Sequence, residues 1–331
     1  MLRFLKNWTL PVAITVGVGL YLLFALTPAL QTAGDVLGPI LERLLPATIF
    51  LTLFVTFSKV DFHLMRLRRW HLLILGAQMT LVALLLFTIL ALPADGSLET
   101  TARKHLLEVV LICVIAPCAS AAPVVVGKLG GDLTQMTTFM LLSSVVASLL
   151  IPALFPLIEP HDGLTFLPAF LAILGKLASV LLLPLLLGAI VRHWVKPVYD
   201  FIKSTPDLGF YLWSVCLAIT SGLTMRNILT SHTAAHLFGA IALLPLATAI
   251  VQALIGGAIG RSIGKRICTR QAMFQKNTGL AIWIAWVFLT PEASIGAGCY
   301  VLWQNIINSY ELWLHRRSGA RGAGQSATPK A

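Results

Sequence analysis

The sequence predicts an all-α integral membrane protein with ten transmembrane helices, arranged as two inverted repeats of five. Three observations predict it: an apolar composition, ten apolar segments of membrane-spanning length, and basic residues concentrated on one side. Of the 331 residues, 57% are hydrophobic and 11% are charged, and the mean hydropathy is +0.87. Soluble domains carry about 25% charged residues. The composition therefore places the chain in the membrane class before any motif is considered.

Composition also argues against several kinds of partner. The formal net charge is +11, but the basic residues recur in short runs between apolar segments, which indicates membrane topology and no nucleic-acid partner. The five cysteines are odd in number and lack C-x-x-C spacing, so free thiols are expected and no metal site. We expect no cofactor. The sequence leaves the oligomeric state open.

The first predicted helix follows a short basic N-terminus that has the shape of a signal peptide. Residues 9–26 are long enough to cross a bilayer, and no convincing small-x-small cleavage site follows, so we expect a retained span. Further segments are bounded by charge, proline or glycine, because a bilayer core needs about 20 apolar residues per helix. The predicted spans are residues 9–27, 40–57, 70–92, 105–126, 133–157, 165–191, 207–225, 235–258, 271–290 and 296–315.

The positions of the basic residues test this span count, because Lys and Arg collect in cytoplasmic loops. With the N-terminus inside, most of the 24 Lys and Arg residues fall on the cytoplasmic side. Only Arg103, Lys104 and Arg226 fall on the opposite side, and one missed helix would invert every later loop. We therefore predict that both termini are cytoplasmic, and we expect a bacterial inner membrane.

Ten spans divide into two sets of five, residues 1–157 and 160–315. Because five is odd, the second set starts on the opposite side of the membrane from the first, which is the arrangement of an inverted repeat. The remaining segment, residues 316–331, is rich in Gly, Ala and Ser and is expected to be a disordered cytoplasmic tail.

Two corresponding spans carry sequences that interrupt a helix. The fourth contains Ala-Pro-Cys-Ala-Ser-Ala-Ala-Pro at residues 116–123, and the ninth contains Gln-Lys-Asn-Thr-Gly at residues 275–279. Alone, either could be a simple kink or a close helix contact. At matching positions of two repeats, they predict a binding site near the middle of the membrane, because unpaired backbone groups are tolerated there only when buried in protein or lining a cavity.

Lys276 is the central residue of the predicted site. A charge at this depth costs about 3 kcal/mol on insertion scales. A neutral amine, a bound anion or hydrogen bonds to helix-end carbonyls would each compensate for it, and a side chain reaching the lipid headgroups is the simpler alternative. Lys176, in the sixth span, fits a structural and a functional role equally well.

Four polar side chains elsewhere are candidates for the same cavity, although each alone is more typical of an interhelical contact. They are Gln78 in the third span and Gln304, Asn305 and Asn308 in the tenth.

The chain resembles the bile acid:sodium symporter family and its wider carrier superfamily. The resemblance rests on the segment from Pro117 to Asp132, on Lys-Asn-Thr-Gly-Leu-Ala at residues 276–281, and on Tyr-Val-Leu-Trp-Gln-Asn at residues 300–305. It is similar to that family in span count over nearly the whole chain. It implies a core and a panel domain, with broken helices four and nine crossing, and a symporter-like carrier that moves an organic anion by alternating access.

Most sodium ligands that the resemblance implies are missing. The family's Ser-Asn of helix four corresponds to Ala122-Pro123, and its helix-five Ser and Thr correspond to Met136 and Met140. Its shared Glu falls at Ala272 and its ninth-helix Gln at Lys276, so only Gln78 remains. Because sodium needs several oxygen ligands, we expect no family-type sodium coupling, with Lys276 substituting for the ion's charge near Gln78 or making transport proton-linked.

The leading interpretation is a secondary transporter for a small organic anion, with Ser120, Lys276, Asn277, Thr278 and Asn305 as substrate contacts. Two alternatives remain open. An arsenite-type efflux carrier would use Cys118, although the carboxylate of such carriers in helix nine is absent; a non-transporting sensor or scaffold would explain the lost ion ligands. An enzyme is not expected, because H-E-x-x-H, G-x-S-x-G and paired membrane aspartates are missing.

Overall fold

The computed structural model describes residues 9–93, 95–159, 165–205, 207–230 and 235–325. In these residues every regular element is a helix, apart from one isolated antiparallel bridge between Cys118 and Lys276. Six helices are long and apolar enough to cross a membrane, judged by length and composition: residues 28–58, 69–90, 133–158, 166–194, 211–230 and 237–262. The protein is therefore an all-helical integral membrane protein.

The helices follow the apolar segments of the sequence. They are α2 (Thr9–Leu26), α3 (Pro28–Ser58), α4 (Arg69–Leu90), α5 (Leu98–Ile115), α6 (Ala122–Lys128), α7 (Leu133–Ile158), α8 (Phe166–Leu177), a π-helical turn η2 (Ala178–Leu182), α9 (Leu183–Trp194), α10 (Lys196–Ser204), α11 (Leu208–Thr230), α12 (Ala235–Ser262), α13 (Arg266–Phe274), α14 (Thr278–Phe288) and α15 (Pro291–Gln325).

Three features differ from the sequence-based expectation. Helix α3 begins at Pro28, well before residue 40, because a proline is well accommodated in the first turn and the helix continues through Asp35 and Pro39. The short helix α10 was not predicted, since it is amphipathic and too short to span, with only Ile202 buried. Helix α15 continues to Gln325, into the segment for which disorder was expected; residues 326–331 lie outside the described residues.

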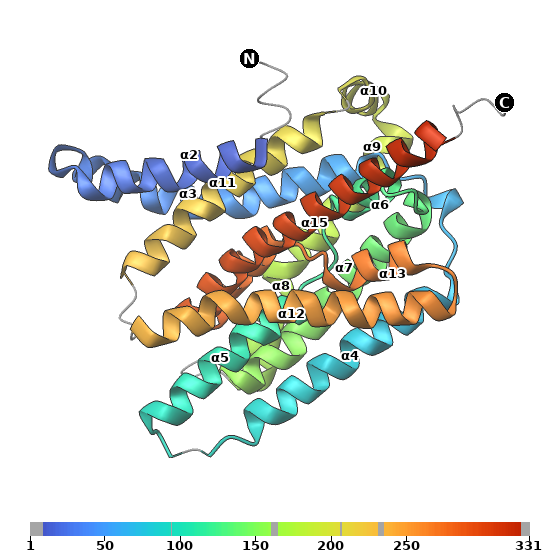
Figure 1. Ribbon diagram of the computed structural model, residues 1–331. Coiled ribbons are helices and arrows are strands. Elements are labelled where there is room, and N and C mark those ends of the chain that lie inside the picture. Colours follow the sequence, from blue (N-terminus) through green and yellow to red (C-terminus); the bar gives the residue numbers. More distant parts are fainter. Residues whose placement is uncertain (1–8, 94, 160–164, 206, 231–234, 326–331) are drawn as a thin grey trace.

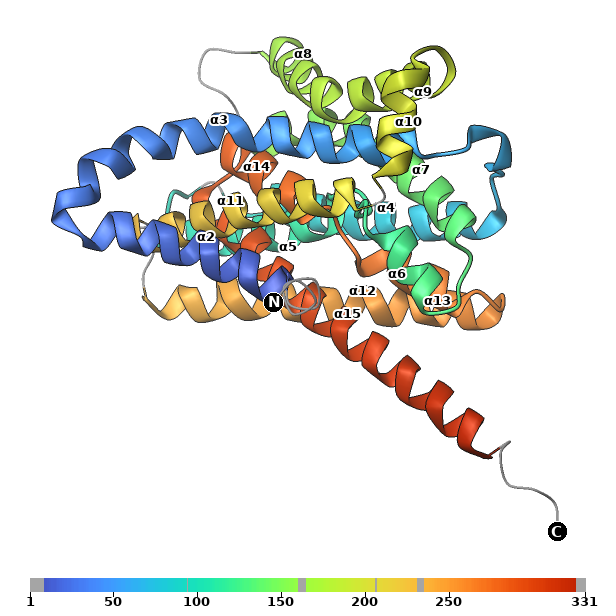
Figure 2. The same cartoon turned by 90° about the horizontal axis from the view of Figure 1, so that it is seen from above.

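The helices pack in two groups. Helices α2, α3 and α11 lie side by side, with α9 and the turn η2 against α3 (Figures 1 and 2). Helices α4, α5, α12, α13, α14 and α15 pack around one another, and α7 contacts α4, α6 and α8. Helix α11 also contacts α14 and α15. The buried apolar core runs through both groups, so it joins them where they meet.

The bundle has two distinct ends. The connections from α3 to α4 and from α12 to α13 lie at one end, and those from α2 to α3 and from α4 to α5 lie at the other (Figure 1). The interruptions between α5 and α6 and between α13 and α14 fall between these ends.

Candidate functional site

The α5–α6 interruption is produced by two prolines. Ala116 ends α5 with φ −53° and ψ 140°, an extended conformation typical of a residue before proline. Pro123 lies in the first turn of α6, where its missing N–H costs nothing. Six residues between the helices, 116–121, are therefore available to line a site.

The α13–α14 interruption is shorter and is stabilised by a side-chain cap. Gln275 leaves α13 in an extended conformation, and the Asn277 side-chain oxygen accepts a hydrogen bond of 3.2 Å from the Leu280 N–H. Asn277 is thus the N-cap of α14, a position that favours Asn. The polar sequence that predicted the break also begins the next helix.

The two interruptions cross and pair through their backbones. Ala119 N–H donates to the Gln275 carbonyl at 2.9 Å, and Asn277 N–H donates to the Pro117 carbonyl at 2.8 Å. These bonds flank the bridge between Cys118 and Lys276. Because each unwound segment satisfies backbone groups of the other, non-helical chain is stable inside the membrane.

Side chains of neighbouring helices complete the crossing. The Cys118 N–H donates to Ser143 Oγ on α7 at 3.0 Å. The Lys276 N–H donates to Gln304 Oε1 on α15 at 2.6 Å, and Gln304 Nε2 donates back to the Lys276 carbonyl at 3.2 Å. The backbone of both bridge residues is therefore fixed from outside the crossing.

Glutamines also stabilise the carboxyl ends of α5 and α13. Gln78 Nε2 donates to the Val114 carbonyl at 2.8 Å. Tyr300 donates to the Phe274 carbonyl at 2.6 Å and accepts from Gln252 Nε2 at 3.0 Å. Gln78 is buried and is not among the cavity-lining residues described next, so its observed contact is with a helix end.

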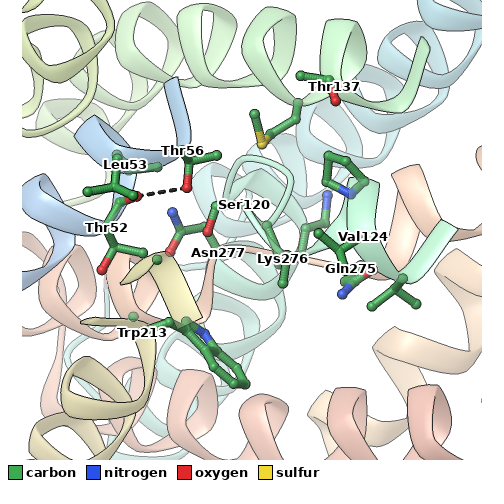
Figure 3. Close-up of a pocket in the computed structure, with 18 of the residues that line it drawn as sticks. Thr52, Leu53, Thr56, Ser120, Val124, Thr137, Trp213, Gln275, Lys276 and Asn277 are labelled. Carbon is green, nitrogen blue, oxygen red and sulfur yellow. Dashed lines mark hydrogen bonds between the residues drawn. The ribbon is translucent and has the colours of Figure 1, made fainter. Parts of the chain in front are cut away.

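A cavity of about 790 Å³ lies against the crossing and is lined by α3, α6, α7, α11 and α15. All five expected substrate contacts line it: Ser120, Lys276, Asn277, Thr278 and Asn305. Figure 3 shows Ser120, Lys276 and Asn277 grouped between Thr52 and Thr56 on one side and Thr137 on the other. Gln304 and Asn308 line the cavity as well.

Lys276 is a cavity-lining residue whose side-chain amine lacks a hydrogen-bond partner in the described chain. Its side chain is only 1% exposed, and its Nζ has no hydrogen-bond partner within the described chain. The thiols of Cys113 and Cys118 are close enough to interact with it electrostatically. Its backbone is held firmly while its amine lacks a protein partner.

The mouth of the cavity carries paired charges. Asp61 accepts a 2.8 Å hydrogen bond from Arg192. Burial lowers the pKa of Lys59, and the Asp207 carboxylate opposes this shift. All three cavity residues, Lys59, Asp61 and Asp207, lie at the end of the bundle that holds the α3–α4 connection.

A family model for the sodium bile acid symporters matches residues 46–231, more than half of the chain. The chain belongs to the sodium bile acid symporter family. No curated protein matches the chain. As a member of this family it is a membrane transport protein.

The positions that the family resemblance assigns to sodium ligands are occupied by apolar groups. Met136 and Met140 on α7 and Ala122 and Ala272 beside the crossing are all fully buried. Thioether sulfur and methyl groups are not ligands for a hard cation, which needs several oxygen atoms. The residues present do not fit the family's sodium sites.

Two other residues singled out in the sequence, Cys118 and Lys176, lie away from the cavity. Cys118 is 3% exposed and is not among the lining residues, so the arsenite interpretation gains no support from the geometry. Lys176 Nζ lies 5.2 Å from the centre of the Phe288 ring, a cation–π contact between α8 and α14. The observed contact of Lys176 is therefore with an aromatic side chain and not with the cavity.

Sequence reasoning missed the α3 and α11 contributions to the cavity. Thr52 and Thr56 line it one helical turn apart, and Trp213 and Thr220 line it from α11. Threonines at an i, i+4 spacing in an apolar helix were the available signal. Trp213 gave no signal distinct from an ordinary membrane tryptophan.

Proposed function

We propose that the protein is a secondary carrier for a small organic anion, working by alternating access without the family's sodium ligands. The observation that carries the proposal is the Lys276 amine, buried against the cavity with no hydrogen-bond partner in the described chain. A substrate carboxylate would supply the missing partner and offset a burial cost of about 3 kcal/mol.

The rest of the cavity supports a small anion with an apolar part. Its neutral hydrogen-bonding groups, Ser120, Asn277, Thr278 and Asn305, face a lining that also includes Leu53 and Trp213. Pockets of this kind combine an apolar wall with a few polar groups that orient the ligand. In the absence of bound substrate, Lys276 would occupy the electrostatic place of a sodium ion.

Paired helix contacts support two inverted five-helix repeats, residues 1–157 and 160–315. Helix α4 packs on α5 as α12 packs on α13, and α6 packs on α7 as α14 packs on α15. Helix α2 packs on α11 as α9 packs on α3. In this proposal α2, α3, α8, α9 and α11 form the panel and the remaining spans form the core, with helices four and nine crossing inside it.

The cavity position supports an arrangement open to the cytoplasm. Its mouth includes Lys59 and Lys128, which belong to the basic loops that the topology assigns to the cytoplasmic side. We therefore propose a bacterial inner-membrane carrier with both termini in the cytoplasm, in a conformation whose cavity opens to the cytoplasm.

The test begins with purified full-length protein and a panel of small carboxylates, sulfonates and neutral analogues. An anionic substrate should raise the thermal unfolding temperature and be taken up by proteoliposomes equally well in sodium and in potassium buffer. Lys276→Met should weaken anion binding by at least about tenfold, because it removes the buried partner of the anion.

Lys176→Met is the matched control, since it removes a membrane lysine that does not line the cavity, and it should retain binding. Strictly sodium-dependent uptake would contradict the proposed coupling. Anion binding that survives Lys276→Met unchanged would contradict the role of Lys276. A screen in which no solute changes thermal stability would favour the sensor or scaffold alternative.

A further inference from the structure

A second buried ionisable group lies on the side of the crossing that faces away from the cavity mouth. Glu108 is on α5, near the middle of the helix and slightly closer to its end at Ile115, and its side chain is 0% exposed. It is not among the residues that line the cavity. The helix runs from Glu108 to the crossing at Ile115, about 10 Å along its axis.

One neutral side chain, that of Thr290, donates a hydrogen bond to Glu108 in the described chain. Thr290 Oγ1, beside the start of α15, donates to Glu108 Oε2 at 2.8 Å, and Glu108 Oε1 has no hydrogen-bond partner. One neutral donor is little compensation for a carboxylate removed from water. The Oε1 atom of Glu108, which has no hydrogen-bond partner in the described chain, can carry a proton.

The ammonium group nearest to Glu108, that of Lys104, lies closer to the carboxylate of Glu159. Lys104 Nζ lies 2.6 Å from Glu159 Oε1 at the end of α7 but 3.9 Å from Glu108 Oε1. Glu108 and Glu159 are also electrostatic neighbours. Two carboxyl groups therefore share one lysine, and the buried carboxyl has the weaker share.

The other charged groups around α5 do not supply a positive charge to Glu108. His105 on α5 lies 3.5 Å from Glu292 on α15, forming a separate pair. The basic residues of α4, Arg69 and His71, lie at the end of the bundle that holds the α3–α4 connection, away from Glu108. Among the side chains of α12 that the structure describes, the charged one is Arg261, which lies at that same end. Helix α14 carries no ionisable residue.

We propose that Glu108, together with Glu159 and Lys104, forms a proton-binding site that supplies the coupling ion of this carrier. The inference rests on the proposed transport function and names the ion that replaces sodium. The proton comes from solvent on this side of the crossing, where the Lys104 and Glu159 side chains are 30% and 31% exposed. It adds to Glu108, which becomes a neutral acid.

Binding the proton changes the contacts of three helices. When Glu108 is neutral, Lys104 pairs with Glu159 alone. The protonated Glu108 also has an O–H donor on the oxygen that previously lacked a hydrogen-bond partner. Glu159 ends α7, Thr290 precedes α15, and α5 leads directly to the crossing. Proton occupancy at Glu108 is thereby linked to the segment that carries the substrate-binding residues.

The proton itself is the first probe, so no substrate is needed. Infrared difference spectra between acid and alkaline buffer should show the C=O stretch of a protonated carboxyl in full-length protein in nanodiscs. The band should disappear in Glu108→Gln and remain in Glu99→Gln, which removes an exposed carboxyl on the same helix. A band unchanged in Glu108→Gln overturns the proposal.

Thr290→Val provides a second measurement that leaves Glu108 intact, in case Glu108→Gln folds poorly. Removing the Thr290 hydroxyl, which donates to the carboxylate, should shift the titration midpoint of the band toward alkaline pH, because the hydrogen bond favours the charged form. An unshifted midpoint overturns the proposed contact.

Uptake measured with and without a proton gradient tests the proton site independently of the proposed anion transport. An inward proton gradient should accelerate uptake of the stabilising anion several-fold, and Glu108→Gln should abolish the acceleration while preserving anion exchange. Uptake by the unaltered protein that ignores the gradient overturns the proton site alone. If no anion binds, the proposed function fails, and the infrared band still tests whether Glu108 takes up a proton.

Discussion

Cys118 and Lys276 form a single antiparallel bridge in an otherwise helical described chain, and each has its backbone N–H held by a side chain of another helix. Ser143 serves Cys118 and Gln304 serves Lys276. The crossing therefore places a cysteine and a lysine opposite each other, each fixed by a side chain of a different helix.

Gln304 is expected to be the principal stabilising side chain of the crossing, because it bonds both backbone groups of Lys276. Gln304→Leu leaves those buried groups unpaired and should cost about 1–3 kcal/mol of stability for each group. Thermal unfolding in detergent measures the loss. Gln31→Leu, which removes an exposed glutamine, should change stability by less than about 0.5 kcal/mol.

Asn277 is expected to have two separable roles, as the cap of α14 and as a cavity contact. Asn277→Ala should lose about 1 kcal/mol of stability through the missing cap. Asn277→Asp should retain the cap, since Asp is as good an N-cap residue, yet weaken binding of an anion by charge repulsion. Equal anion affinity in Asn277→Asp and the unaltered protein would contradict the second role.

Close packing of α12 against α13 depends on Gly260. A Cβ atom there would lie 2.6 Å from the Arg266 Cα and 2.9 Å from its backbone nitrogen, where backbone cannot easily move. Gly260→Ala should therefore lower the unfolding temperature. Gly239→Ala on the same helix meets nothing within 4 Å and should be neutral or stabilising by up to about 1 kcal/mol. Similar effects of both changes would contradict this contact.

Labelling with a membrane-impermeant thiol reagent should locate the cavity mouth. In a Cys216→Ala background, which removes the native cysteine that lines the cavity, Thr56→Cys should react only from the cytoplasmic side. Asp95→Cys, in the exposed α4–α5 connection, should react only from the opposite side. Reaction of Thr56→Cys from the outside alone would reverse the proposed orientation.

Most of the helices could be predicted from the sequence, because membrane helices are recognised by their length and apolar composition. The two interruptions were also accessible, since Pro117 and Pro123 cannot sustain a regular helix and Asn277 caps the next one. Helix α10 was not, because an amphipathic segment of its length resembles a loop.

The site was accessible only in part. Lys276 and its polar neighbours could be singled out because charge and amides are costly in lipid. The bond between Gln78 and the end of α5 depends on how two helices lie in space, which sequence spacing does not encode. The uncompensated position of Glu108 is likewise a tertiary property, since Lys104 is one turn away yet lies nearer Glu159.

The shared hydrogen bonds of the crossing have a consequence for biosynthesis. The partners of Pro117 and Ala119 are Asn277 and Gln275, which the ribosome adds long after the first half of the chain has entered the membrane. Until then the nascent first half must leave those backbone groups to water or to the insertion machinery. A chain truncated before residue 275 should therefore be degraded rather than accumulate as a stable half-carrier.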